Sequence, residues 1–167
     1  MIKAVVFDMD GLMIDTEKLL LRYWLEAAHY YGYDMRKEHA LGIRSLAAKY
    51  AIPKLKEQLG EDFDYQKVRA LRLKLMNEHI ETYGLEEKPG LGKLLDYLKE
   101  HHYKTAVATA TDLERTKRYL GSLNRLGYFD QIVCAAMVEN GKPAPDIYLE
   151  AAARLDTDPC ECMALED

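Results

Sequence analysis

Hydrophobic positions follow two different spacings along the chain, and the change between them divides it into two kinds of segment. Residues 2–8 contain an unbroken apolar run, Ala4-Val5-Val6-Phe7, typical of strands in a parallel sheet that helices cover on both faces. From residue 16 to residue 84 the apolar positions recur every three or four residues, as on one face of a helix. This stretch is predicted to be all-helical, with helices over 16–31, 36–50, 53–60 and 64–84.

Local signals place the ends of these helices. Gly42 interrupts the second helix, and Pro53 is expected to open the third, because proline suits the first helical position. Asp64 is a suitable N-cap for the fourth helix and Gly84 a suitable stop. These signals indicate where the individual helices of residues 16–84 begin and end.

The spacing changes after the breaker Lys88-Pro89-Gly90. Helices and strands then alternate, with helices over 91–98, 112–120 and 145–155 and strands over 105–109, 131–134 and 162–165. Such alternation predicts an α/β fold with a doubly wound parallel sheet. Because the first strand joins the same sheet, we expect two domains: an α/β domain of residues 1–14 and 87–167, and an inserted helical domain of residues 15–86.

Composition narrows the class of protein. The 167 residues are 49% hydrophobic and 31% charged with a net charge of −5, as in an ordinary globular protein without the basic excess of nucleic-acid binders. No apolar run reaches the length of a membrane span, and no signal-peptide pattern opens the chain. The odd number of cysteines, three, argues against a disulfide framework. We therefore expect a cytoplasmic protein with no nucleic-acid or membrane partner.

Polar side chains follow each predicted strand. They are two carboxylates after the first strand, two hydroxyls after the second, an ammonium after the third and two carboxylates after the fourth: Asp8, Asp10, Thr109, Thr111, Lys142, Glu166 and Asp167. Ligands of open α/β sheets bind at the carboxyl ends of strands. Carboxylates beside a dry sheet need a counter-charge, and Mg²⁺ prefers oxygen ligands. The set suits phosphoryl transfer, in which catalysis is mostly positioning and charge neutralisation.

Each of these residues also has an ordinary structural explanation. Asp10 fits a turn, Thr109 fits the end of a strand, Lys142 fits a solvated loop, and Glu166 with Asp167 fits an exposed terminus. Together, however, these explanations require four coincidences at four strand ends. The functional interpretation is therefore favoured.

The motifs also carry a resemblance to a known family. They are Asp8-Met9-Asp10-Gly11, Asp15-Thr16-Glu17, Thr109, Gly141-Lys142-Pro143-Ala144-Pro145-Asp146 and Leu165-Glu166-Asp167. In this order and spacing they resemble the haloacid dehalogenase superfamily, and within it the β-phosphoglucomutase-like group of sugar-phosphate phosphatases and mutases. The resemblance implies a Rossmann-like catalytic core, a helical cap inserted after the first strand, and a phosphomonoester hydrolase that acts on a small phosphorylated metabolite.

The resemblance also implies roles for individual residues. Asp8 would be the nucleophile, and Asp10 the general acid and base. Thr109 and the backbone N–H of Ala110 would hold phosphoryl oxygens, with Thr111 beyond them, and Lys142 would neutralise charge between the phosphoryl group and Asp8. The implied cofactor is Mg²⁺, held by Asp8, the Asp10 carbonyl, Glu166 and Asp167.

The predicted cap bears on the choice between phosphatase and mutase. Mutases of this group carry a histidine on the first cap helix, where this chain has Leu20, which does no proton chemistry. Gly42 and Arg44 resemble a substrate-contacting segment of the phosphatases. Trp24 stands where relatives contact substrate, although cap packing explains it as well. We expect a phosphatase, with a phosphoglucomutase as the alternative.

The last residue, Asp167, belongs to the fourth motif, whereas relatives continue beyond it. A sheet ordered 4-1-2-3 would leave its fourth strand as an open edge, which invites pairing with another chain. We expect a monomer for the longer protein and a shortened chain here, with lower melting temperature and turnover than an extended version. The further alternative is an inactive fragment that binds phosphate or metal.

Overall fold

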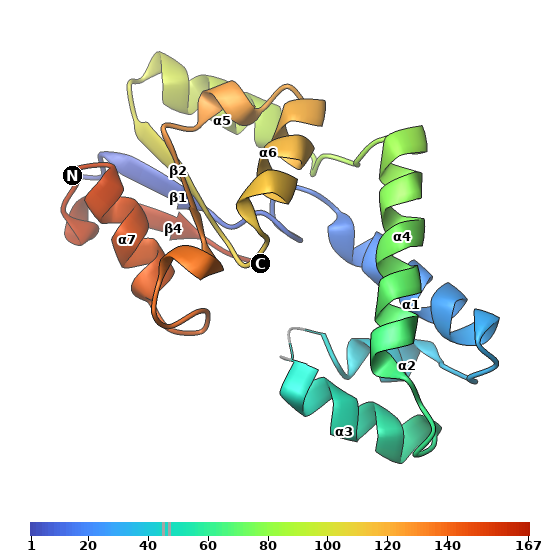
Figure 1. Ribbon diagram of the computed structural model, residues 1–167. Helices are drawn as coiled ribbons and strands as arrows, with labels where there is room; N and C mark the ends of the chain where they lie inside the picture. Colours follow the sequence, from blue (N-terminus) through green and yellow to red (C-terminus); the bar gives the residue numbers. More distant parts are fainter. Residues whose placement is uncertain (45, 47) are drawn as a thin grey trace. The chain divides into compact units, whose positions relative to one another are not determined.

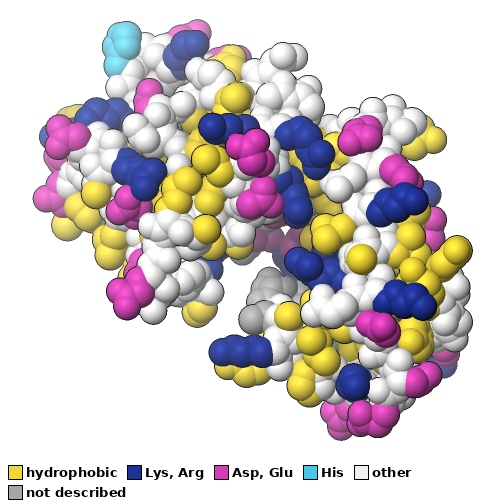
Figure 2. Space-filling model, viewed as in Figure 1, with side chains coloured by type: hydrophobic (Ala, Val, Ile, Leu, Met, Phe, Trp, Pro, Cys, Tyr) yellow, Lys and Arg dark blue, Asp and Glu magenta, His cyan; other side chains and the backbone are white. Residues whose placement is uncertain are grey.

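The computed structural model describes residues 1–44, 46 and 48–167, and the chain divides into two compact units. One unit combines Met1–Asp15 with Leu85–Asp167 and holds the sheet. The other unit is the helical segment Thr16–Gly84. Figure 1 shows the elements of both, and Figure 2 the side chains on one face of the molecule. In the residues described, no helix is both long and apolar enough to span a membrane.

The sheet unit is built on parallel strands in the order β3-β2-β1-β4, which confirms the predicted fold class and strand order. The strands are β1 (Ala4–Phe7), β2 (Lys104–Thr109), β3 (Gln131–Cys134) and β4 (Cys162–Leu165). β1 is shorter than the predicted 2–8. The pairing nevertheless extends one residue beyond each end, because the N–H groups of Lys3 and Asp8 donate to the carbonyls of Glu161 and Leu165.

Helices cover the two faces of this sheet (Figure 1). They are α5 (Leu91–Glu100), α6 (Leu113–Ser122) and α7 (Asp146–Arg154), with short 3₁₀ turns η1 (Leu126–Tyr128), η2 (Ala135–Met137) and η3 (Pro159–Glu161). From α7, Ile147 and Ala151 are fully buried against Val6, Ala106 and Val133. This continuous apolar packing explains why the strands show no polar alternation.

The helical unit contains α1 (Thr16–Tyr30), α2 (Lys37–Leu41), α3 (Ala48–Leu59) and α4 (Tyr65–Tyr83). The predicted interruption at Gly42 is confirmed, because α2 ends at Leu41, but the second part of the predicted helix 36–50 belongs to α3, which begins at Ala48. Pro53 does not open a helix but lies inside α3. Fully buried Leu55 and nearly fully buried Ala51 anchor α3 in the core of the unit, so packing outweighs the hydrogen bond that proline cannot donate.

The start of α4 offers a stability test. Asp64 accepts a hydrogen bond from the Lys67 N–H over 3.0 Å and so caps α4, as predicted. Replacing Asp64 with alanine leaves this N–H without its acceptor and should lower the free energy of unfolding by about 1 kcal/mol. Chemical denaturation measures the change. Asp62→Ala, at an exposed neighbouring position, should change it by less than about 0.5 kcal/mol; equal losses from both variants would contradict a capping role.

The two chain segments that lead to and from the helical unit are joined within the sheet unit. Ile14 and Glu87 form an antiparallel bridge, and the Asp15 N–H donates to the Glu86 carbonyl over 2.9 Å. Arg125 adds an ion pair to Glu87, with Nε and Oε2 2.7 Å apart. The linkers therefore belong to the folded core rather than to loose loops.

Candidate active site

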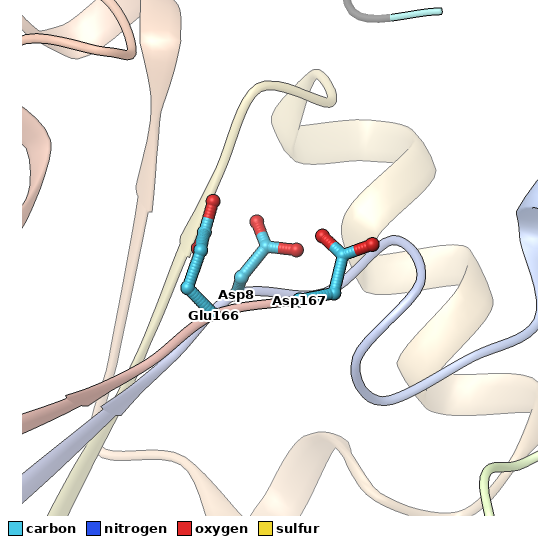
Figure 3. Close-up of side chains that lie close together, drawn as sticks. All are labelled: Asp8, Glu166 and Asp167. Carbon is cyan, nitrogen blue, oxygen red and sulfur yellow. The ribbon is translucent and has the colours of Figure 1, made fainter.

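Three carboxylates meet where β1 and β4 end. The parallel register pairs Phe7 with Leu165, so Asp8 lies beside Glu166 and Asp167 at the same edge of the sheet. One carboxylate oxygen from each residue lies within 4.8 Å of the others, and Figure 3 shows all three side chains on one side of the strands. Clustered carboxylate oxygens are suitable ligands for a hard divalent cation.

Asp8 is the buried member of this cluster, with 6% of its surface exposed. Burial raises its pKa to about 6 from the ordinary 3.8, although Lys142 and the Met9 N–H act in the opposite direction. The charge of Glu166 raises it further. The negative charge on Asp8 is therefore costly without more positive charge nearby, which a bound cation supplies.

Lys142 reaches the cluster from the loop after β3. Its ammonium contacts Asp8 Oδ1 and lies 3.0 Å from Glu166 Oε2. Burial alone would lower the pKa of Lys142, but hydrogen bonds with Asp8, Tyr148 and Glu166 raise it. The side chain is thus a fixed positive charge in contact with Asp8.

Asp10 is held by hydroxyl groups rather than by the ammonium of Lys142. Its Oδ2 accepts a hydrogen bond from Thr111 Oγ1 over 2.7 Å and a longer one from Thr109 Oγ1 over 3.4 Å. Thr109 Oγ1 in turn accepts from the Thr111 N–H over 3.1 Å. Ala110, between them, is exposed directly after β2. The two aspartates that follow β1 therefore differ in these contacts: Asp8 contacts the Lys142 ammonium, and Asp10 accepts from two hydroxyl groups.

The sites predicted in the helical unit can be placed only within that unit. Trp24 is buried beside Tyr65, with ring centroids 5.4 Å apart, and under the guanidinium of Arg72. Arg44 forms an ion pair with Glu17. The Gly42 carbonyl accepts from Lys54 Nζ over 2.8 Å. The substrate contacts assigned to Trp24, Gly42 and Arg44 stay predictions.

Sequence reasoning missed Tyr148, which contacts both Lys142 and Glu166. Its hydroxyl donates to Glu166 Oε2, and its ring centroid lies 5.1 Å from Lys142 Nζ. An aromatic residue on an amphipathic helix ordinarily packs in the core. The available signal was its position in the first turn of α7, six residues after Lys142.

Comparison with known proteins identifies relatives that cover nearly the whole chain. A family model described as haloacid dehalogenase-like hydrolase matches residues 5–167. A phosphorylated carbohydrates phosphatase of Thermotoga maritima is 32% identical, covering 99% of this chain and 76% of the relative. A β-phosphoglucomutase of Bacillus subtilis is 28% identical, covering 99% and 75%. The crystal structure of CbbY from Rhodobacter sphaeroides in complex with phosphate superposes with a TM-score of 0.78 at 27% identity, covering 100% and 78%.

Proposed function

Because this chain belongs to the haloacid dehalogenase-like hydrolase family, we propose that it is a Mg²⁺-dependent phosphatase of small phosphorylated sugars or polyols. The observation that carries the proposal is the arrangement of Asp8: a buried carboxylate at a strand end, in contact with an ammonium and beside two further carboxylates. The names of the relatives support the substrate class, since one acts on phosphorylated carbohydrates.

In this proposal Asp8 is the nucleophile. One carboxylate oxygen attacks phosphorus, the bond from phosphorus to the sugar oxygen breaks, and an aspartyl-phosphate forms. Asp10 gives its proton to the leaving alkoxide. In the second step Asp10 takes a proton from water, which attacks phosphorus and releases inorganic phosphate and Asp8.

The neighbouring groups hold and neutralise the phosphoryl group. Lys142, already in contact with Asp8, reduces the repulsion between an anionic nucleophile and an anionic substrate. Thr109 and the Ala110 N–H hold phosphoryl oxygens at the end of β2. Asp8, Asp167 and the Asp10 carbonyl would hold Mg²⁺, with Glu166 among or beside them, and the bound cation would supply further charge neutralisation.

A phosphoglucomutase is the second candidate, because the chain is also 28% identical to a β-phosphoglucomutase. The two reactions share the attack by Asp8 and differ in the acceptor of the phosphoryl group. A mutase returns it to a sugar hydroxyl, whereas a phosphatase transfers it to water. Leu20 on α1 is apolar and supplies no proton donor, which favours the phosphatase.

The test is phosphate release from a panel of hexose and polyol phosphates, with Mg²⁺ and with the metal removed by EDTA. We expect at least one substrate to be hydrolysed with Mg²⁺, a loss of about a hundredfold or more on chelation, and recovery when Mg²⁺ is added back. Undiminished release in EDTA would contradict the metal requirement. Conversion of β-glucose 1-phosphate into glucose 6-phosphate without phosphate release would favour the mutase, and no turnover of any substrate would favour a chain that binds phosphate or metal without catalysis.

A further inference from the structure

Tyr148, in the first turn of α7, contacts two side chains that the proposed reaction uses. Its hydroxyl donates a hydrogen bond to Glu166 Oε2, and its ring centroid lies 5.1 Å from Lys142 Nζ. An aromatic face attracts an ammonium at this distance. One side chain therefore contacts both members of the Lys142–Glu166 ion pair.

Glu166 Oε2 takes part in two of these interactions. Lys142 Nζ donates to Oε2 over 3.0 Å and to Oε1 over 3.1 Å, while Tyr148 also donates to Oε2. Hydrogen bonds to a carboxylate are strong because the acceptor is charged. Both oxygens of Glu166 thus face Lys142, and one of them is shared by two donors.

This arrangement affects the carboxylate cluster as well. An oxygen of Glu166 lies within 4.8 Å of oxygens of Asp8 and Asp167, so Glu166 has two potential roles, as the partner of Lys142 and as a ligand of a cation. The Tyr148 hydroxyl favours the first role, because it bonds the oxygen that Lys142 also bonds. Lys142 contacts Asp8 in turn.

We propose that Tyr148 is a positioning residue that holds Glu166 on Lys142 and thereby keeps the Lys142 ammonium on Asp8. The inference rests on the proposed phosphatase reaction and adds to it a residue outside the set proposed to hold substrate and metal. Loss of the Tyr148 hydroxyl alone should lower turnover but strengthen Mg²⁺ binding. Turnover falls because Glu166 no longer holds the Lys142 ammonium on Asp8 as firmly. Mg²⁺ binds more tightly because Glu166 is freer to bind a cation.

The experiment compares Tyr148→Phe with the unaltered chain and with Tyr128→Phe. Tyr128 is a matched control, because its hydroxyl donates to Asp96 Oδ1 over 2.6 Å and its ring lies 5.2 Å from Lys99 Nζ, away from the carboxylate cluster. For Tyr148→Phe we expect kcat to fall about tenfold with KM changed by less than about twofold. Calorimetric titration with Mg²⁺ alone should give a Kd about threefold lower. Tyr128→Phe should change neither quantity.

A second background separates positioning from damage to the fold. In Glu166→Gln the carboxylate that Tyr148 orients is gone, so adding Tyr148→Phe should alter kcat and the Mg²⁺ Kd by less than about twofold. The inference is overturned if Tyr148→Phe weakens Mg²⁺ binding and turnover together, or if its effects persist undiminished in Glu166→Gln. The Mg²⁺ titration requires no substrate, so a chain without phosphatase activity would refute the proposed function while the titration still decides the role of Tyr148.

Discussion

Replacing Asp8 with asparagine should reduce phosphate release by at least about a thousandfold, because a carboxamide oxygen is too weak a nucleophile to form the aspartyl-phosphate. Asparagine has the shape of aspartate, so the end of β1 and its neighbours should keep their positions. Phosphate release with the best substrate of the panel, at saturating Mg²⁺, measures the loss. Release that survives the substitution would refute the proposed mechanism.

The same variant should be more stable than the unaltered protein when no metal is present. The pKa of Asp8 is about 6 in the folded protein against an ordinary 3.8, so the folded state holds its proton more tightly than the unfolded state does. The cost of the charged form is absent below pH 3.8, grows between pH 3.8 and 6, and is complete above pH 6. The difference between these two pKa values corresponds to a loss of about 3 kcal/mol in the free energy of unfolding at pH 7, which Asp8→Asn should restore.

Denaturation in EDTA at several pH values tests this second effect. The stabilisation by Asp8→Asn should shrink steadily as the pH falls from about 6 toward 4. Asp158→Asn is the control, because Asp158 caps the η3 turn by accepting from the Cys160 N–H over 2.8 Å, and asparagine caps equally well. It should leave activity and stability near their original values. A destabilised Asp8→Asn variant would show that the ion pair with Lys142 outweighs burial.

Replacing Asp10 with asparagine should lower turnover of sugar phosphates by about a hundredfold to ten-thousandfold, the usual contribution of a general acid and base. The carboxamide oxygen still accepts hydrogen bonds from Thr111 and Thr109, so the side chain should stay in place. It carries no proton to the leaving group and takes none from water. Both chemical steps are therefore impaired while binding is kept.

A substrate with a good leaving group separates the two steps. With p-nitrophenyl phosphate the first step needs no acid, so Asp10→Asn should release a burst of nitrophenolate equal to the enzyme concentration and then stall as aspartyl-phosphate. Asp130→Asn is the control, because Asp130 accepts from the Thr105 N–H over 2.8 Å at the start of β2, the end opposite the site. It should behave like the unaltered enzyme. Unchanged turnover in Asp10→Asn would contradict its role in proton transfer.

The sheet was predictable because its signals are local. Buried strands appear as short apolar runs between turn residues, and the bounds of β3 and β4 agree with the predicted 131–134 and 162–165. The cap Asp64 was also predictable, and it accepts a hydrogen bond from the N–H three residues later. In α3, local signals were misleading, because Pro53 marks a helix start by propensity while the buried Leu55 and Ala51 place α3 by packing.

The convergence of the candidate site residues at one sheet edge was predictable, but the contacts between their side chains were not. Parallel strands bring their carboxyl ends to one edge, so the convergence of Asp8, Glu166 and Asp167 follows from topology. The contacts of each side chain depend on distances in the folded protein, which the spacing of residues along the sequence does not give. The sequence therefore indicated neither the hydroxyl pair that holds Asp10 nor the bond from Tyr148 to Glu166.

The joined linkers give the chain a modular construction. Asp15 and Glu86 are connected by a backbone hydrogen bond inside the sheet unit. The helical segment is therefore connected to the sheet unit at two neighbouring positions. The spacing between the two linkers is thus set within the sheet unit, by residues outside the helical segment.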